Sequence, residues 1–248
     1  EANKDQFRHQ MLEMQQAELE SRRIIARSPN MIKALRRATK VASADSSVLI
    51  LGESGVGKGV IADMIHHNSR RSDHPLIKIN CGAIPESLIE AELFGYEKGA
   101  FSGAGASGKK GLIEEAANGT LFLDEVGDLS LEAQAKLLRV MEDRRISKLG
   151  TTVTHEFDVR VIAATNQDLK GLIADGRFRQ DLFHRLNTFV LHLPPLRERT
   201  EDIAILARRF LVQVAAELGQ EENFQPTPVA VYFGEPGVTV SDPAAPAC

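Results

Sequence analysis

One segment, Gly52-Glu53-Ser54-Gly55-Val56-Gly57-Lys58-Gly59, constrains the fold more than any other part of this sequence. It follows an apolar run at residues 47–51 and precedes a helical pattern that starts at Val60. Two Gly separated by four residues and followed by Lys, between a strand and a helix, form a P-loop, which wraps phosphate groups with backbone N–H groups and the Lys ammonium. We therefore expect a nucleotide-binding α/β domain in which Gly52 to Val60 contact the nucleotide.

Four further apolar runs of strand length follow, with helical patterns between them. The five predicted strands are residues 47–51, 76–80, 120–123, 159–164 and 189–193. This alternation is typical of a parallel sheet with crossover helices, so we predict a five-stranded parallel sheet flanked by helices. Amphipathic patterns predict helices at about residues 31–42 and at residues 131–150, the second ending at Gly150.

The third predicted strand ends in two carboxylates, Asp124 and Glu125. After a P-loop, one such carboxylate holds Mg²⁺ and a second orients and deprotonates the attacking water, so we assign these roles to Asp124 and Glu125 respectively. Gly59 stands where a Ser or Thr hydroxyl usually contacts Mg²⁺, so phosphates, water and Asp124 are expected to hold the metal. Asn166 follows the fourth predicted strand and is a candidate sensor of the γ-phosphate, although Asn is also a normal turn residue there.

Composition excludes several classes of protein. The chain has 248 residues, of which 43% are hydrophobic and 26% charged, with a net charge of −4. No apolar run reaches the roughly 18 residues of a membrane helix, so no membrane contact is expected. The absence of a strong basic balance argues against an autonomous nucleic-acid-binding chain. The two cysteines fit a reducing compartment better than a disulfide-stapled domain, and the His positions show no zinc-ligand spacing.

Between the second and third predicted strands lies Gly99-Ala100-Phe101-Ser102-Gly103-Ala104. This segment resembles the GAFTGA signature of bacterial sigma-54-dependent transcription activators, the NtrC-type family of AAA+ ATPases, with Ser102 in place of the usual Thr. The P-loop and residues 121–125, 178–186 and 193–199 carry the same resemblance, which extends from about residue 24 to residue 211.

The resemblance implies a bacterial, cytoplasmic ATPase that assembles into a ring, usually a hexamer. In this family, ATP hydrolysis drives the remodelling of the sigma-54 RNA polymerase holoenzyme into an open promoter complex. Residues 99–104 would then contact sigma-54 with Phe101 as an apolar anchor, unless Phe101 packs into the core of its own chain. DNA binding is implied for the full-length protein but not for this chain.

The resemblance also assigns roles to Arg179, Arg185 and Asn80. The two Arg match arginine fingers that reach the γ-phosphate bound by the neighbouring subunit, with ordinary surface charge as the alternative. Six residues along a straight helix rotate by about 600°, so the two Arg are not expected to share one face, and one of them could hold the interface. Asn80 matches the Asn that keeps the catalytic Glu inactive until the partner is engaged, whereas a strand-end Asn that caps a turn is the alternative.

Four segments are expected along the chain. Residues 1–23 are predicted to be a linker helix from an N-terminal regulatory domain that precedes Glu1, or an ordinary surface helix. The AAA+ α/β ATPase core takes residues 24–195, the start of a helical lid residues 196–224, and a Pro-rich, disordered tail residues 225–248.

The family's lid supplies an Arg that contacts ATP, but no Lys or Arg follows Arg209. A second hypothesis is therefore a nucleotide-binding interaction module with little turnover and a truncated lid. An unrelated P-loop motor or chaperone is disfavoured because it does not account for residues 99–104.

Overall fold

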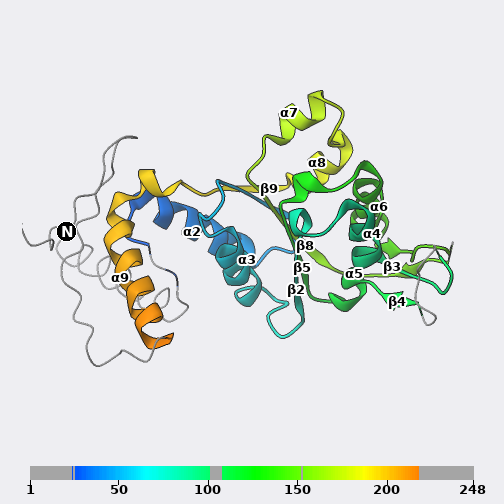
Figure 1. Cartoon of the computed structure of the whole chain (residues 1–248), viewed down its shortest axis with the longest axis horizontal. Coiled ribbons are helices and arrows are strands. Elements are labelled where there is room, and N and C mark those ends of the chain that lie inside the picture. The colour runs from blue at the N-terminus through cyan, green and yellow to red at the C-terminus, as the bar shows by residue number, and fades with distance from the viewer. Residues whose placement is uncertain (1–23, 25, 101–107, 152, 218–248) are drawn as a thin grey trace, which may run out of the picture.

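A five-stranded parallel sheet forms the centre of the molecule (Figure 1). The computed structural model describes residue 24 and residues 26–100, 108–151 and 153–217. In spatial order the strands are β2 Leu76–Asn80, β5 Thr120–Asp124, β8 Arg160–Thr165, β1 Val48–Leu51 and β9 Phe189–His192. Every neighbouring pair in this sheet is parallel. All five predicted strands are confirmed.

Helices cover both faces of the sheet (Figure 1). One face packs against α2 Pro29–Ala42 and α3 Lys58–His67. The opposite face packs against α4 Glu86–Phe94, α5 Leu112–Glu115, α6 Leu131–Asp143, α7 Leu169–Ala174 and α8 Gln180–Leu186. A last helix, α9 Thr200–Glu217, lies beyond α2 and away from the sheet.

Short elements connect these helices and strands. The 3₁₀ helices of the described chain are η1 Cys81–Ala83, η2 Val126–Asp128 and η3 Leu196–Glu198. Two small antiparallel ladders pair β3 Gly95–Tyr96 with β4 Lys109–Lys110 and β6 Arg145–Ile146 with β7 His155–Glu156. No helix formed by the described residues has the length and apolar character needed to cross a bilayer.

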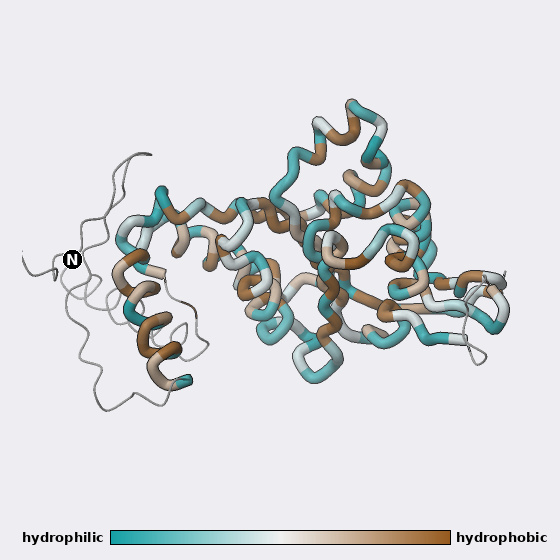
Figure 2. The backbone as a smooth tube through the Cα atoms, in the orientation of Figure 1, coloured by the Kyte–Doolittle hydropathy of each residue, from teal (hydrophilic) through white to brown (hydrophobic). Residues whose placement is uncertain are grey.

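Successive residues of the central strands supply two hydrophobic cores. In β5, Leu121 and Leu123 pack toward α4 and α6, whereas Phe122 between them packs toward α2 and α3. Side chains alternate between the faces of a strand, so a sheet covered on both faces needs apolar residues at consecutive positions. Figure 2 shows hydrophobic residues gathered along the central strands, in agreement with this requirement.

The helix predicted at residues 131–150 ends at Asp143, so its predicted C-terminus at Gly150 is wrong. Arg144 adopts a left-handed conformation with φ of 50°, and its carbonyl oxygen accepts the Phe157 N–H at 2.7 Å. Pairing with β7 then holds the chain extended, and Ile146 enters the core from β6. Pairing between β6 and β7 therefore ends the helix before Gly150, the C-terminus predicted from the sequence.

The N-terminus of α2 lies two residues before its predicted start. Pro29 occupies the first turn, and the Ser28 hydroxyl accepts the Met31 N–H at 3.4 Å. Two other expectations, the linker helix at residues 1–23 and the tail at residues 225–248, lie outside the described residues.

The first residue of β8, Arg160, holds the C-terminus of α2 from inside the protein. Its side chain is 2% exposed. The guanidinium donates to the carbonyl oxygens of Val41 and Ala42 at 2.9 Å and of Ser46 at 3.3 Å. These bonds satisfy both the buried cation and carbonyl groups that a helix end leaves without partners.

Replacement of Arg160 by Met is expected to lower the free energy of unfolding by about 3 kcal/mol, because three acceptors lose their donor at about 1 kcal/mol each. Urea unfolding of the two proteins measures this difference. Arg139 is exposed on α6 and provides the control, because Arg139→Met should change the value by less than about 0.5 kcal/mol. Equal free energies of unfolding for Arg160→Met and Arg139→Met would contradict this role of Arg160.

Candidate nucleotide site

The polar residues singled out in the sequence lie at the carboxyl ends of the central strands. The P-loop follows β1, and Asp124 at the end of β5 is in register with Asn80 at the end of β2. Thr165 at the end of β8 pairs with Leu51 of β1, so Asn166 comes next to the start of the P-loop. In open α/β sheets, ligands bind at this edge.

The P-loop backbone takes conformations that depend on Gly. Gly55 and Gly57 have φ of 78° and 100°, in the region that side chains rarely adopt. A Cβ on Gly52 would stand 3.0 Å from Val56 Cγ2 and 3.2 Å from the Leu193 carbonyl oxygen. Helix α3 then starts at Lys58 without a side-chain cap, which suits an N-terminus whose N–H groups bind phosphate.

The ammonium group of Lys58 joins the P-loop to the end of β5. Lys58 is 5% exposed, and Nζ donates to Oε1 of Glu125 at 3.0 Å. It also donates to the carbonyl oxygens of Gly52 at 3.2 Å and Glu53 at 3.3 Å. The other carboxylate oxygen of Glu125 accepts the Asn166 N–H at 3.1 Å. The structure thus brings together three of the residues predicted from separate motifs.

The two carboxylates at the end of β5 differ in backbone and environment. Glu125 has φ of 52° and ψ of 52°, a left-handed conformation that costs a residue with a side chain about 1 kcal/mol. Strain of this kind gathers at functional sites. Burial, with a further contribution from the charge of Glu125, raises the pKa of Asp124, and Lys58 partly opposes the shift.

A hard cation beside Asp124 would offset this unfavourable burial of negative charge. The two adjacent carboxylates of Asp124 and Glu125 supply oxygen ligands of the kind that Mg²⁺ prefers. Gly59 offers no side-chain oxygen, and a Cβ there would have Phe122 Cε1 as its near neighbour at 3.9 Å. The residues present therefore fit Mg²⁺ held by Asp124 together with phosphate and water.

Asn80 caps the turn that follows β2. Its Oδ1 accepts the Gly82 N–H at 2.9 Å, which is the capping geometry named as the alternative to a regulatory role. The contacts described for Asn80 do not include Glu125. Next to it, burial raises the pKa of Cys81 to about 12, so this thiol stays protonated and unreactive at neutral pH.

The two candidate arginine fingers lie in different structural settings. Arg179 precedes α8 in an extended conformation and pairs with Asp181 at 2.7 Å, whereas Arg185 lies within α8 and donates to the Met141 carbonyl oxygen at 2.8 Å. The assumption that both occupy one straight helix is therefore wrong. Within the described chain, the hydrogen bonds of these two Arg join α6 and α8 and not the P-loop.

Gly99 and Ala100, the described residues of the segment 99–104, follow closely after β3 in a stalk made of β3 and β4. A Cβ on Gly95 would stand 2.5 Å from the Lys109 carbonyl oxygen, so the stalk can close only with Gly at this position. The segment after β6 completes the stalk, because Leu149 donates to the Gly95 carbonyl oxygen at 3.0 Å. Gly99 and Ala100 belong to the described chain, and the remaining loop residues, Phe101, Ser102, Gly103 and Ala104, lie outside it.

The P-loop contacts η3 and the residue after it, an interaction that the sequence did not indicate. Arg197 in η3 forms a bidentate ion pair with Glu53 at 2.7 and 2.8 Å. Arg199 is 6% exposed and donates to the Val56 carbonyl oxygen inside the P-loop at 3.0 Å. The sequence run Arg-Glu-Arg is the available signal, but such a run is usually a solvated surface.

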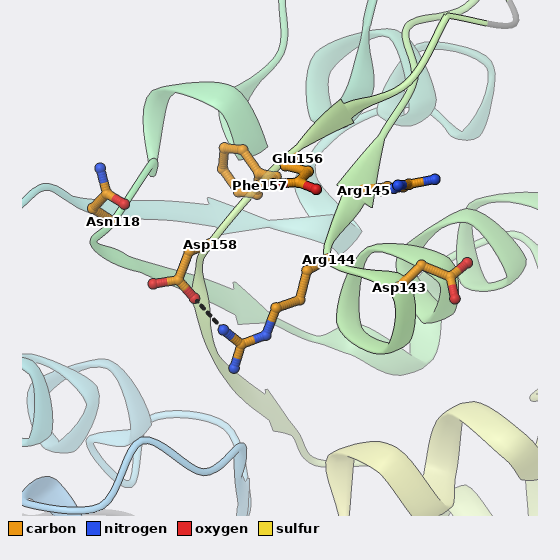
Figure 3. Close-up of a pocket in the computed structure, with 7 residues that line it drawn as sticks. All are labelled: Asn118, Asp143, Arg144, Arg145, Glu156, Phe157 and Asp158. Atoms are coloured by element: carbon orange, nitrogen blue, oxygen red, sulfur yellow. Dashed lines mark ion pairs between the residues drawn. The ribbon is translucent and has the colours of Figure 1, made fainter.

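A cavity of about 830 Å³ lies at the opposite, amino-terminal edge of the sheet (Figure 3). Asp158 precedes β8 and pairs with Arg144 at 3.4 Å across this cavity, while Arg145 points to the other side. Arg71 pairs with Asp158 at 2.8 Å and with Asp45 at 2.6 Å. These charges are already paired, so we interpret this cluster as a structural one that the sequence did not indicate.

Comparison with known proteins gives consistent matches. Residues 24–192 match the family model described as the sigma-54 interaction domain. The chain is 52% identical over 194 residues to "Regulatory protein AtoC" of Escherichia coli K12, covering 78% of this chain and 42% of that protein. It is 50% identical over 205 residues to "Nitrogen fixation protein VnfA" of Azotobacter vinelandii, covering 83% and 39% respectively. The chain thus spans less than half the length of these relatives.

Solved structures of NtrX from Brucella abortus share the fold. The complex with ADP has a TM-score of 0.74 and 36% identity, covering 88% of this chain and 48% of that one. The complex with ATP has a TM-score of 0.73 and 35% identity, covering 89% and 50%. The AAA+ P-loop fold expected from the sequence is confirmed.

Two neighbouring Gly are expected to respond in opposite ways to replacement by Ala in the nucleotide-free protein. Gly57→Ala should lower the free energy of unfolding by about 1 kcal/mol, because φ of 100° is unfavourable for a residue with a Cβ. Gly59→Ala, with helical backbone and only an ordinary van der Waals contact to Phe122 Cε1 at 3.9 Å, should raise it by about 0.5 kcal/mol. Urea unfolding measures both, and the same sign for the two variants would contradict the P-loop conformation described.

Proposed function

The chain belongs to the sigma-54 interaction domain family, and from this premise we propose that it binds Mg²⁺–ATP at the P-loop and hydrolyses it to remodel sigma-54 RNA polymerase holoenzyme. The observation that carries the proposal is the convergence of Lys58, Glu125 and the Asn166 N–H at the carboxyl edge of the sheet. A buried ammonium beside a phosphate-binding loop and a carboxylate beyond it are the two charges that phosphoryl transfer to water requires.

Nucleotide binding exchanges the partner of Lys58. The P-loop Lys binds β- and γ-phosphate oxygens, so the triphosphate competes with Glu125 for the same ammonium. Once released, the carboxylate of Glu125 is free to accept a proton from the attacking water. The Asn166 N–H can still donate to the carboxylate of Glu125 and orient it. The Lys58–Glu125 ion pair thus keeps the general base occupied until substrate arrives.

Asp124 is the residue proposed to hold Mg²⁺. The metal would neutralise phosphate charge during transfer, and phosphate oxygens and water would complete its ligands in place of a hydroxyl at Gly59. The hydrogen bond from the Glu125 N–H to Oδ1 of Asp124, at 3.1 Å, fixes the orientation of this carboxylate.

Arg179 and Arg185 are proposed to act on the nucleotide of a neighbouring chain in a ring, which is usually hexameric in this family. Their described contacts lie on α6 and α8 rather than at the P-loop of their own chain. Arg179 is 41% exposed in its side chain and is held by Asp181, so it is accessible to a neighbour. Arg185 is tied to α6 and is the better candidate for holding the interface.

Residues 99–104 are proposed to contact sigma-54, with Phe101 as the anchor. The stalk supports this role because it joins the loop to the segment that follows α6. Lys148 of that segment lies 3.7 Å from Glu97, which follows β3, and 3.9 Å from Glu114 in α5.

The proposal extends to the organisation of the protein. We assign the ATPase core to residues 24–195 and the start of a lid to residues 196–224, which include α9. A cytoplasmic, bacterial location follows from the same function. DNA binding is assigned to parts of the full-length protein other than this chain.

Replacement of Glu125 by Gln is expected to lower kcat for ATP hydrolysis by about 100-fold, because the general base is lost. The same change removes the charge that competes for Lys58, so ATP should bind at least as tightly as in the wild type. Steady-state phosphate release and equilibrium binding of a fluorescent ATP analogue measure the two effects. Glu132→Gln, exposed on α6, is the matched control and should leave both unchanged. Undiminished turnover in Glu125→Gln would refute the assignment.

Replacement of Phe101 by Ala is expected to leave basal ATP hydrolysis within about 2-fold of wild type while abolishing capture of sigma-54, because one aromatic anchor supplies most of such a contact. Capture is measured on native gels with an ATP transition-state analogue. Phe210→Ala removes an exposed aromatic ring from α9, at the other end of the molecule from the stalk (Figure 1), and is the control. Sigma-54 capture that survives Phe101→Ala would contradict the contact-loop assignment.

A further inference from the structure

Four residues around the proposed general base form a closed ring of hydrogen bonds. Oε2 of Glu125 accepts the Asn166 N–H at 3.1 Å. The next residue, Gln167, donates from Nε2 to Oδ1 of Asp128 at 2.6 Å. The Asp128 N–H returns to the carbonyl oxygen of Glu125 at 3.0 Å. The ring therefore joins the loop after β8 to η2 through side chains that the phosphate-binding motifs do not include.

The second oxygen of Asp128 lies against the turn that follows β2. A Cβ built on Gly82 would stand 2.7 Å from Oδ2 of Asp128 and 3.5 Å from Oδ1 of Asn80. The absence of a side chain at Gly82 thus permits this approach, and Asn80 holds the Gly82 N–H at 2.9 Å. Asn80 and Gly82 therefore lie beside the carboxylate of Asp128.

We propose that Asp128 and Gln167 are positioning residues for Glu125. Their hydrogen bond holds the Asn166 N–H on the carboxylate of Glu125. The inference rests on the proposed role of Glu125 in ATP hydrolysis. It adds two residues to that reaction.

The orientation of the Glu125 carboxylate depends more strongly on the ring when nucleotide is bound. Withdrawal of Lys58 to the phosphates removes the partner of Oε1, and the Asn166 N–H is then the remaining described donor to Glu125. A main-chain donor orients a carboxylate only if its own loop is fixed. Gln167 fixes that loop at two points, because its N–H donates to Thr165 Oγ1 at 3.1 Å and its side chain reaches Asp128.

The test reverses the polarity of the side-chain bond. Gln167→Glu sets two carboxylates against each other and should break the ring, whereas the double variant Asp128→Asn/Gln167→Glu restores an amide-to-carboxylate bond with donor and acceptor exchanged. Gln213→Glu is the matched control, because Gln213 makes the same kind of bond to Glu217 on α9, at 3.1 Å and far from the site. All variants are made in the full chain of 248 residues.

The expected result is a loss confined to turnover. Gln167→Glu should lower kcat for ATP hydrolysis by about 10-fold with KM within about 2-fold, and the double variant should recover to within about 3-fold of wild type. Gln213→Glu should match wild type. Unchanged kcat in Gln167→Glu, or no recovery in the double variant, would overturn the inference while leaving the role of Glu125 intact.

A second measurement does not depend on turnover. Hydrogen exchange of the Asn166 amide, followed by NMR in the nucleotide-free protein, should be about 10-fold faster in Gln167→Glu and return toward wild type in the double variant. Equal exchange in all proteins would overturn the inference. A wild-type chain that hydrolyses no ATP refutes the proposed function instead, and the exchange rates then still decide whether the ring positions the Asn166 N–H.

Discussion

The buried ammonium group of Lys58 is the interaction on which the rest of the site depends. A cation that is 5% exposed must find acceptors inside the protein, and Lys58 finds three, two from the P-loop backbone and one from Glu125. Because those acceptors follow β1 and β5, the bond fixes two strand ends relative to each other. In the proposed reaction, a triphosphate offers the same ammonium stronger acceptors, and substrate then replaces the contact that stabilises the nucleotide-free site.

Further contacts connect the region around Lys58 to α6 on one side and to η3 on the other. On one side, η2 leads directly into α6, whose N-terminus is capped by Ser130, and α6 leads through β6 to the stalk of residues 99–104. On the other side, Arg197 and Arg199 fasten the P-loop to η3 and so to α9. The P-loop therefore lies between α6 on one side and η3 with α9 on the other, and described contacts join it to both.

The sequence predicted features that depend on local pattern and could not predict those that depend on distant partners. Strands and the P-loop were predictable because apolar runs and Gly spacing are local signals. The end of α6 was not, because pairing of Ile146 with His155 stops the helix before Gly150. The bond between Gln167 and Asp128 joins residues 39 positions apart and leaves no periodic trace in the sequence.

We propose that this site hydrolyses ATP when a neighbouring chain supplies Arg179 across an interface that Arg185 helps to hold. Phosphate release by the purified chain, measured over a wide range of protein concentrations at saturating Mg²⁺–ATP, tests it most directly. The rate per chain is expected to rise with concentration and then to level off as the interface forms. A rate per chain that stays constant across the range, or that never exceeds the uncatalysed rate, would contradict it.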